Sequence, residues 1–349
     1  MKNIIISDVT LRDGNHAVKH QINKDIIKIY SKFAEENKID ILEVGHGNGL
    51  GASSLTIGRS KVSNLDAIKL AKKNLKKTKL SVHSIPGFST LEDLKLAIDN
   101  GADLIRVGCN SSDIDIIERQ FLYCKKNKVE SWCVFMMFHQ IYPNNRYITI
   151  VKNLKKIGIK TFIVMDSAGI LLPEDIKKIF KNLRKLNVRS GFHGHNNLGC
   201  AVSNTLEAIK HGATIVDCAI RGFGAGAGNT QLELIIALLK KLRISKKFNE
   251  RHFYNMSDKF VKILKKNKID YQDIFTNPIS ISTGLNGLFS GFSPKIRSFA
   301  EKYNVSPYDI SNLAGEKQLA AGQDDLLMNI AHNLSMIRKK RIKIKLYRI

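Results

Sequence analysis

Two histidines separated by a single residue, His193 and His195, have the clearest potential for chemistry in this sequence. They follow an extended, β-branched run (188–192) and precede a helical pattern that begins near Ala201. Side chains at positions i and i+2 of a strand point to the same face, so both imidazoles can converge on one point. Two imidazoles and one carboxylate form a common open metal site that leaves coordination positions for a substrate. The pair alone is equally compatible with polar side chains at a strand end.

A second segment, far away in the sequence, supplies the missing carboxylate. Residues 8–16 read DVTLRDGNH and contain Asp13. We predict that Asp13, His193 and His195 bind a divalent cation, which a 2-oxo acid would chelate through its carboxylate and keto oxygens. As a Lewis acid, the metal would stabilise negative charge on the keto oxygen when a neighbouring C–C bond breaks or forms.

Arg12 and His16, in the same segment, complete the predicted chemistry. Arg12 can donate charge-assisted hydrogen bonds to the keto oxygen. His16, with an unperturbed pKa of about 6.5, can act as a general base. Other interpretations remain open: Asp13 could cap a turn, Arg12 could pair with a structural carboxylate such as Glu43, and His16 could be a loop residue without a role.

Short apolar runs alternate with amphipathic helical patterns along most of the chain. The predicted strands span 4–9, 39–44, 80–84, 104–107, 132–137, 162–165, 188–193 and 215–220, and the predicted helices span 24–37, 65–74, 91–99, 113–126, 146–157, 173–186, 199–211 and 231–241. Strands buried on both faces and joined by helices imply a parallel sheet. Eight such units in about 240 residues are what a closed (β/α)8 barrel requires. A doubly wound open sheet is the alternative, but no G-x-G-x-x-G motif follows the first strand.

The regular alternation stops near residue 248. We therefore predict an α/β protein with two domains: a catalytic (β/α)8 TIM barrel over 1–248, and a smaller, mainly helical domain over 249–349 with a basic tail at 338–348. Chemistry in such a barrel occurs at the carboxyl ends of the strands. Five predicted strands are followed there by polar residues, namely Arg12, Asp13 and His16; Glu43 to His46; His83 and Ser84; Asp166 and Ser167; His193 and His195. Glu43 and Asp166 are interpreted as supporting carboxylates rather than ligands.

Composition narrows the class of protein. No apolar run of the 349 residues is long enough to cross a bilayer, the first residues lack a signal-peptide pattern, and the five cysteines are scattered. These features are typical of a cytoplasmic protein with reduced thiols. The net charge of +25 comes from lysines spread over nearly every helical segment without accompanying aromatics. This distribution favours solvated helix faces over a nucleic-acid surface.

Four motifs give a specific resemblance. DVTLRDGNH at 8–16, EVGHGNGLGASS at 43–54, HGHNNLG at 193–199 and GAGAGN at 224–229 resemble the metal-dependent 4-hydroxy-2-oxovalerate aldolases. That family is the pyruvate-aldolase branch of the superfamily that includes hydroxymethylglutaryl-CoA lyase. The similarity continues in order to AAGQDDLL at 320–327 and covers most of the chain.

The resemblance implies a barrel with a helical C-terminal domain and a metal on Asp13, His193 and His195, with Mn²⁺ expected and Mg²⁺ or Co²⁺ as alternatives. It implies that Arg12 stabilises the enolate of pyruvate and that His16 deprotonates the C4 hydroxyl of a 4-hydroxy-2-oxo acid. It also implies a homo-oligomer and, as a partner, an acylating acetaldehyde dehydrogenase that receives the aldehyde through a channel.

The sequence departs from the family pattern at three positions. Phe289 stands where the family has a tyrosine, and His83 lies where a leucine-rich wall is usual. Arg221 replaces a small or apolar residue, and alternation from Asp217 would turn its side chain inward, although it could also reach the surface. We predict that His83, Arg221, Ser167 and Phe289 contact substrate and that the aldehyde is more polar than acetaldehyde.

Two alternatives to a pyruvate aldolase remain at this point. One is an acyl-CoA-dependent condensing enzyme or lyase of the same superfamily, whose C-terminal region would handle the thioester. The other is a catalytically impaired binding homologue, suggested by Phe289 and the high positive charge.

Overall fold

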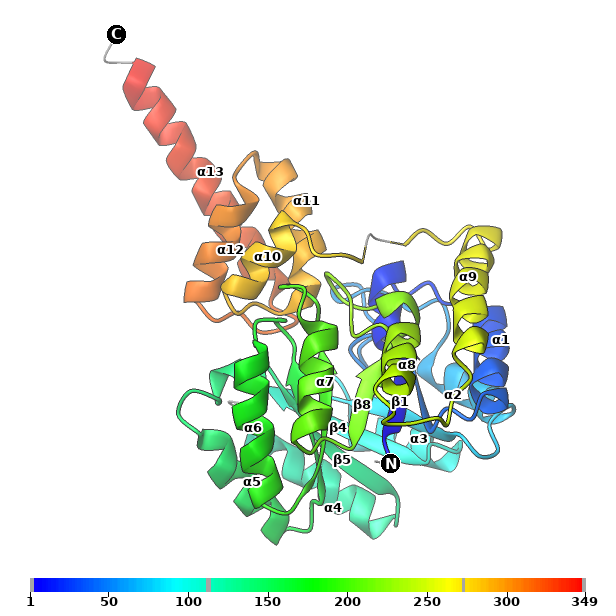
Figure 1. Ribbon diagram of the computed structural model, residues 1–349. Coiled ribbons are helices and arrows are strands. Elements are labelled where there is room, and N and C mark those ends of the chain that lie inside the picture. The colour runs from blue at the N-terminus through cyan, green and yellow to red at the C-terminus, as the bar shows by residue number, and fades with distance from the viewer. Residues whose placement is uncertain (1–2, 111–113, 272–273, 347–349) are drawn as a thin grey trace.

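Eight parallel strands close into a barrel in the computed structural model, which describes residues 3–110, 114–271 and 274–346 (Figure 1). Each strand pairs with its sequence neighbours, and β1 pairs with β8 to complete the ring. The strands are β1 Ile5–Leu11, β2 Ile41–Val44, β3 Lys79–Ser84, β4 Leu104–Asn110, β5 Glu130–Met136, β6 Thr161–Asp166, β7 Arg189–Gly194 and β8 Ile215–Cys218. The predicted (β/α)8 barrel is confirmed.

Helices surround this barrel and continue beyond it. The α-helices are α1 Lys24–Glu36, α2 Asn64–Lys72, α3 Leu91–Asp99, α4 Glu118–Lys126, α5 Arg146–Lys156, α6 Pro173–Lys185, α7 Ala201–His211, α8 Leu232–Lys241, α9 Glu250–Lys266, α10 Pro278–Leu285, α11 Ser293–Tyr303, α12 Pro307–Glu316 and α13 Asp324–Leu346. The 3₁₀ helices are η1 Asp13–Val18, η2 Ile114–Ile117, η3 Phe138–Gln140, η4 Ile220–Gly222 and η5 Ser290–Phe292.

Alternating side chains of β5 pack in two different apolar cores. In β5, Trp132 and Val134 belong to the core inside the barrel, whereas Cys133 and Phe135 pack in the core beneath the helices. Both cores are buried. The strands therefore read as nearly continuous apolar runs, as parallel strands covered on both faces do.

Capping side chains and a first-turn proline mark the starts of several helices. The side chain of Asn23 accepts a hydrogen bond from the backbone of Ile26 at the start of α1, and Thr90 forms a capping box with Asp93 at the start of α3. Pro173 occupies the first turn of α6, where its missing N–H costs nothing. These caps hold each helix in place after a strand.

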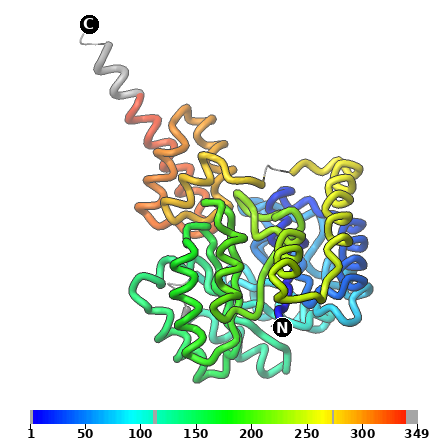
Figure 2. Tube along the Cα trace, viewed as in Figure 1, coloured from blue at the N-terminus to red at the C-terminus, as the bar shows by residue number. Residues whose placement is uncertain are grey.

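Helix α9 lies beyond the predicted domain boundary at residue 248 and packs on the barrel. Phe253 and Phe260 of α9 are buried in the barrel's outer core, and Figure 2 shows α9 alongside α1. A separate apolar core, which includes Leu288, Ile296 and Leu327, joins α10 to α13. The eightfold rhythm ends before α9, so periodicity could not show that this helix still packs on the barrel.

The C-terminal domain lies over the carboxyl ends of the strands. The backbone N–H of Ser290 donates to the carbonyl of Ser167, which follows β6, at 2.9 Å. The hydroxyl of Ser290 donates to the side-chain oxygen of Asn197 after β7 and also lies 3.2 Å from the carbonyl oxygen of Ala225 after β8. One residue thus connects three loops of the barrel rim.

Two further observations concern the helices. No helix in the described ranges combines the length and apolar character needed to cross a bilayer. Figure 1 shows the C-terminal part of α13 extending away from the rest of the molecule.

Two of the predictions fall partly outside the described residues. These are Asp113, predicted to begin the fourth helix, and residues 347–349, at and beyond the end of the predicted basic tail.

Candidate active site

Asp13, His193 and His195 lie together at the carboxyl end of the barrel. Asp13 begins η1 directly after β1, whereas His193 belongs to β7 and His195 follows it. One ligand atom of each residue lies within 4.8 Å of the others, and the two Nε2 atoms are 3.3 Å apart. All three side chains are buried. The prediction that residues 8–16 and 193–199 meet at one end of the barrel is confirmed.

Asp217 and Arg106 orient His193. Its Nδ1 lies 2.9 Å from Oδ2 of Asp217, so this nitrogen donates to the carboxylate and Nε2 keeps its lone pair for a ligand. The guanidinium of Arg106 contacts the same carboxylate. Burial alone would raise the pKa of Asp217, but Arg106 and the hydrogen bond from His193 lower it below its usual value. Asp217 is therefore a carboxylate at neutral pH.

The protonation states of His195 and Asp13 fit a divalent cation. Burial lowers the pKa of His195 to about 3, so its imidazole is neutral at neutral pH. Burial would raise the pKa of Asp13, but Arg12 and the neighbouring histidines hold it well below its usual value. Nδ2 of Asn229 donates to one oxygen of Asp13 at 3.0 Å, and the other oxygen lies 3.8 Å from Nε2 of His193. A neutral imidazole and an ionised carboxylate are donors that divalent metals accept.

Arg12 has one nitrogen available for a ligand. Its Nε donates to Glu43 at 2.7 Å, and its Nη1 donates to Asp13 and to the carbonyl of Gly47. Nη2 is buried and has no hydrogen-bond partner among the described residues. Because a buried donor without a partner is costly, an oxygen of a bound ligand would satisfy it. Arg12 thus pairs with Glu43 through Nε, while its Nη2 can still donate to a ligand.

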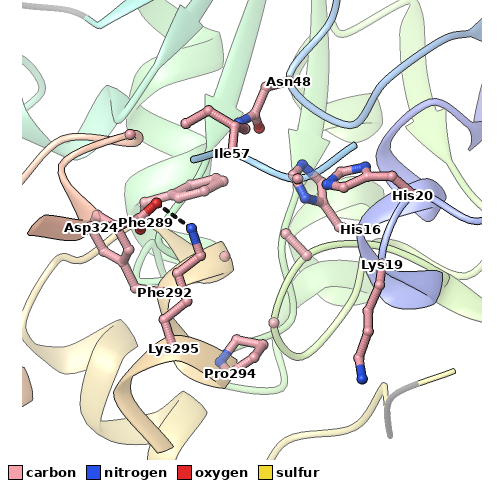
Figure 3. Close-up of a pocket in the computed structure, with 15 residues that line it drawn as sticks. His16, Lys19, His20, Asn48, Ile57, Phe289, Phe292, Pro294, Lys295 and Asp324 are labelled. Carbon is pink, nitrogen blue, oxygen red and sulfur yellow. Dashed lines mark hydrogen bonds and ion pairs between the residues drawn. The ribbon is translucent and has the colours of Figure 1, made fainter. Parts of the chain in front are cut away.

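His16 projects from η1 into a neighbouring cavity of about 210 Å³. Burial lowers its pKa, and the charge of Asp13 only partly offsets this effect, so the ring is neutral at neutral pH. Gly47 leaves room for the ring, because a Cβ there would lie 2.4 Å from Nε2 of His16. Figure 3 shows His16 and Phe289 lining the same cavity, and their ring centroids are 6.2 Å apart.

His83 and Ser167 lie at the barrel rim, as the sequence predicted for both. His83 is buried on β3, and its charge interactions include Arg12, Asp13 and His193. The hydroxyl of Ser167 accepts a hydrogen bond from the backbone of Met137 at 3.0 Å. The structure therefore brings both side chains to the same end of the barrel as the three candidate ligands.

Arg221 is not brought to the site. It is exposed, and its guanidinium reaches the hydroxyl of Ser257 on α9 at 3.5 Å. The alternation expected from Asp217 fails because β8 ends at Cys218, and Arg221 lies in the turn of η4 with a φ of 53°. The predicted contact of Arg221 with substrate has no support in this arrangement.

Comparisons with known proteins agree with this geometry. Residues 3–260 match the HMGL-like family, and residues 274–336 match the DmpG-like communication domain. A 4-hydroxy-2-oxovalerate aldolase from Pectobacterium atrosepticum is 39% identical over 341 residues, 96% of each chain. The aldolase of that name from Spirochaeta aurantia is 38% identical, over 95% of this chain and 96% of its own. The chain belongs to the 4-hydroxy-2-oxovalerate aldolase family.

This member of the aldolase family also has the same fold as solved structures of more distant proteins. The carboxyl transferase domain of Rhizobium etli pyruvate carboxylase, solved with pyruvate and biocytin, superposes with a TM-score of 0.81. The match covers 95% of this chain and 61% of that one at 16% sequence identity. At this identity the comparison shows the shared barrel architecture alone.

Several residues around this aldolase site were not singled out from the sequence. Arg106 and Asp217 lie in the barrel interior, Asn229 holds Asp13, and Ser290 connects the two domains. Arg106 and Asp217 did leave a signal, because each is a charged residue inside an apolar strand (LIRVG and IVDCA). A charge at an inward position of a buried strand needs a partner, and here the two are partners of each other.

Proposed function

We propose that this protein catalyses the reversible cleavage of a 4-hydroxy-2-oxo acid into pyruvate and an aldehyde. The observation that carries the proposal is the convergence of Asp13, His193 and His195 beside Nη2 of Arg12, which has no partner in the described part of the chain. The relatives that match along nearly the whole chain are named 4-hydroxy-2-oxovalerate aldolases. They favour this reaction over the acyl-CoA-dependent alternative.

Asp13, His193 and His195 would hold the divalent cation, for which we propose Mn²⁺. When bound, the metal supplies Lewis-acid stabilisation of charge on the 2-oxo oxygen of the substrate. Asp217 keeps His193 in the tautomer that a ligand needs, and Asn229 holds the carboxylate of Asp13 in place.

Arg12 would donate from Nη2 to the 2-oxo oxygen. The guanidinium is positioned before substrate arrives, because Glu43, Asp13 and the carbonyl of Gly47 already hold its other nitrogens. A positioned cation aimed at an oxygen that gains negative charge stabilises the transition state more than the ground state.

His16 would act as the general base in cleavage. Its neutral imidazole accepts the proton of the C4 hydroxyl, and the C4 oxygen forms the aldehyde carbonyl as the C3–C4 bond breaks. The electron pair of that bond passes to the 2-oxo oxygen and gives the enolate of pyruvate, which becomes pyruvate on protonation at C3. In the condensing direction the same proton returns to the new hydroxyl.

The C-terminal domain points to a partner. Because residues 274–336 match a DmpG-like communication domain, we propose that an acylating aldehyde dehydrogenase receives the released aldehyde there. Dehydrogenase activity that co-purifies with the chain on native size-exclusion chromatography would support this association.

The function is tested by removing and restoring the metal. We expect the purified protein to cleave 4-hydroxy-2-oxovalerate and to release pyruvate from oxaloacetate, to lose both activities in EDTA, and to regain them with Mn²⁺. The double variant His193→Ala and His195→Ala should lack bound metal and both activities, whereas His332→Ala, at an exposed histidine, should retain them. Full activity of the metal-free protein would contradict the proposal.

A further inference from the structure

The proposed mechanism gives no step to two polar side chains on neighbouring strands, one of which, His83, the sequence predicts to contact substrate. His83 lies on β3 and Asn110 is the last residue of β4. A Cβ at Gly108 of β4 would lie 2.6 Å from Cε1 of His83, so the imidazole covers Gly108. Asn110 lies two residues beyond Gly108 and therefore on the same face of β4.

Both side chains contain a buried polar atom without a partner. Nδ1 of His83 and Oδ1 of Asn110 have no hydrogen-bond partner among the described residues. The whole side chain of His83 is buried, with 2% of the residue exposed. Buried polar groups are almost always hydrogen-bonded in native proteins, so these two atoms on adjacent strands need a partner, which a bound ligand can supply.

The position of the pair identifies the part of the substrate that would meet it. The candidate metal ligands and Arg12 lie at the carboxyl ends of β1 and β7, and under the proposed function these groups would hold the pyruvate portion. In the closed ring β3 lies opposite β7, with β4 beside it. Under the proposed function, a ligand that extends from the metal across the barrel mouth would bring its aldehyde portion toward His83 and Asn110.

The chemistry of the pair favours a neutral hydroxyl group. Burial, together with the charges of Arg12 and Arg106, holds the pKa of His83 well below its usual value, so the ring is neutral. A neutral imidazole has one donor and one acceptor nitrogen, and the amide oxygen of Asn110 is an acceptor. A hydroxyl group both donates and accepts. Arg221, the cation that would have favoured an anionic group, lies outside the site.

We propose that His83 and Asn110 bind the hydroxyl group of a short hydroxyaldehyde, which replaces an alkyl aldehyde as the reaction partner of pyruvate. This inference rests on the proposed aldolase function. An apolar aldehyde of the same size would leave both buried polar atoms unpaired, and sites built to bind a hydroxyl discriminate strongly against analogues that lack it.

Glycolaldehyde and propanal form a matched pair for the test, because a hydroxyl replaces a methyl group at equal size. With Mn²⁺ and pyruvate, we expect kcat/KM for aldol addition to favour glycolaldehyde by at least about tenfold. His83→Leu should reverse this preference, by lowering addition to glycolaldehyde and sparing or raising addition to propanal. Asn110→Leu should shift the ratio in the same direction, and His332→Leu, at an exposed histidine, should leave it unchanged.

Oxaloacetate decarboxylation separates this inference from the function on which it rests. Decarboxylation reports on the metal and the pyruvate portion alone, so in His83→Leu it should fall far less than glycolaldehyde addition. A wild-type protein without decarboxylation would overturn the aldolase function and this inference together. Normal decarboxylation combined with a preference for propanal, or an equal loss for both aldehydes in His83→Leu, would overturn only the role of His83 and Asn110.

Discussion

Buried charges at the site alternate in sign along a connected network. Glu43 lies between Arg12 and Arg106, and Asp217 lies between Arg106 and His193. Each charge that leaves water is thereby compensated by a neighbour, which a buried ion requires. The network also continues from the middle of the barrel to a candidate metal ligand, so residues that touch no substrate can still set the position of His193.

Asp217→Asn tests this network at its junction with His193. The amide keeps the size of the side chain but loses the charge that orients the imidazole and compensates Arg106. We expect the affinity for Mn²⁺, measured by calorimetric titration, to fall about 10- to 100-fold. Asp99→Asn, in an exposed pair with Lys95, is the control. Equal affinity of wild type and Asp217→Asn would show that Asp217 does not orient a ligand.

The protonation of His16 predicts the pH dependence of cleavage. A general base works when it is deprotonated, and burial lowers the pKa of His16 below its usual value. Activity should therefore persist as pH falls through about 6.5, the ordinary pKa of histidine, and decline only below it. The profile of kcat/KM against pH at saturating Mn²⁺ measures this decline at low pH. A decline centred above the ordinary pKa would rule out the lowered pKa for the base.

At the scale of elements, loops at the carboxyl ends of the strands set the distances between functional groups. Residue 47, in the loop after β2, touches both catalytic candidates: its carbonyl accepts from Arg12, and its lack of a side chain admits His16. The loop is held in turn by Asn64 at the start of α2, whose side chain accepts from the backbone of His46 at 2.9 Å. The base is thus positioned by an element other than its own.

Gly47→Ala tests this arrangement. Since the added Cβ would lie 2.4 Å from Nε2 of His16, the ring must move. A displacement of about 1 Å can cost 100-fold in rate, so we expect kcat for cleavage of 4-hydroxy-2-oxovalerate to fall about 10- to 100-fold. Oxaloacetate decarboxylation, which does not need a base at C4, should fall much less. Parallel losses in the two reactions would indicate a general disturbance instead.

The whole molecule is a barrel extended by α9 and covered at its carboxyl rim by a small helical domain. The ring of Phe260 on α9 packs against Tyr30 of α1 and against Phe223, in the loop after β8, with centroid distances of 5.6 and 5.2 Å. The same Tyr30 donates a hydrogen bond to the buried Asp8 of β1 at 2.7 Å. Through these contacts α9 supports β1, the strand that directly precedes Arg12.

Phe260→Ala measures how firmly α9 belongs to the barrel. Truncating a fully buried phenylalanine costs about 3–5 kcal/mol, and we expect this loss in the free energy of unfolding from urea denaturation. Tyr254→Ala, at an exposed position of the same helix, should change stability little. If both variants unfold alike, α9 is not part of the barrel core.

The sequence by itself determined the eight strand–helix units and the residue types of the metal site, because hydrophobic periodicity and the spacing of His193 and His195 are local properties. It also identified Asp13 as the candidate carboxylate ligand, because the carboxyl ends of the strands in a closed barrel lie at the same rim. Only the tertiary structure decided that Arg221 turns away, because the early end of β8 breaks the alternation. The placement of α9 on the barrel and of Asn110 beside His83 depends on packing between distant segments, which local pattern does not encode.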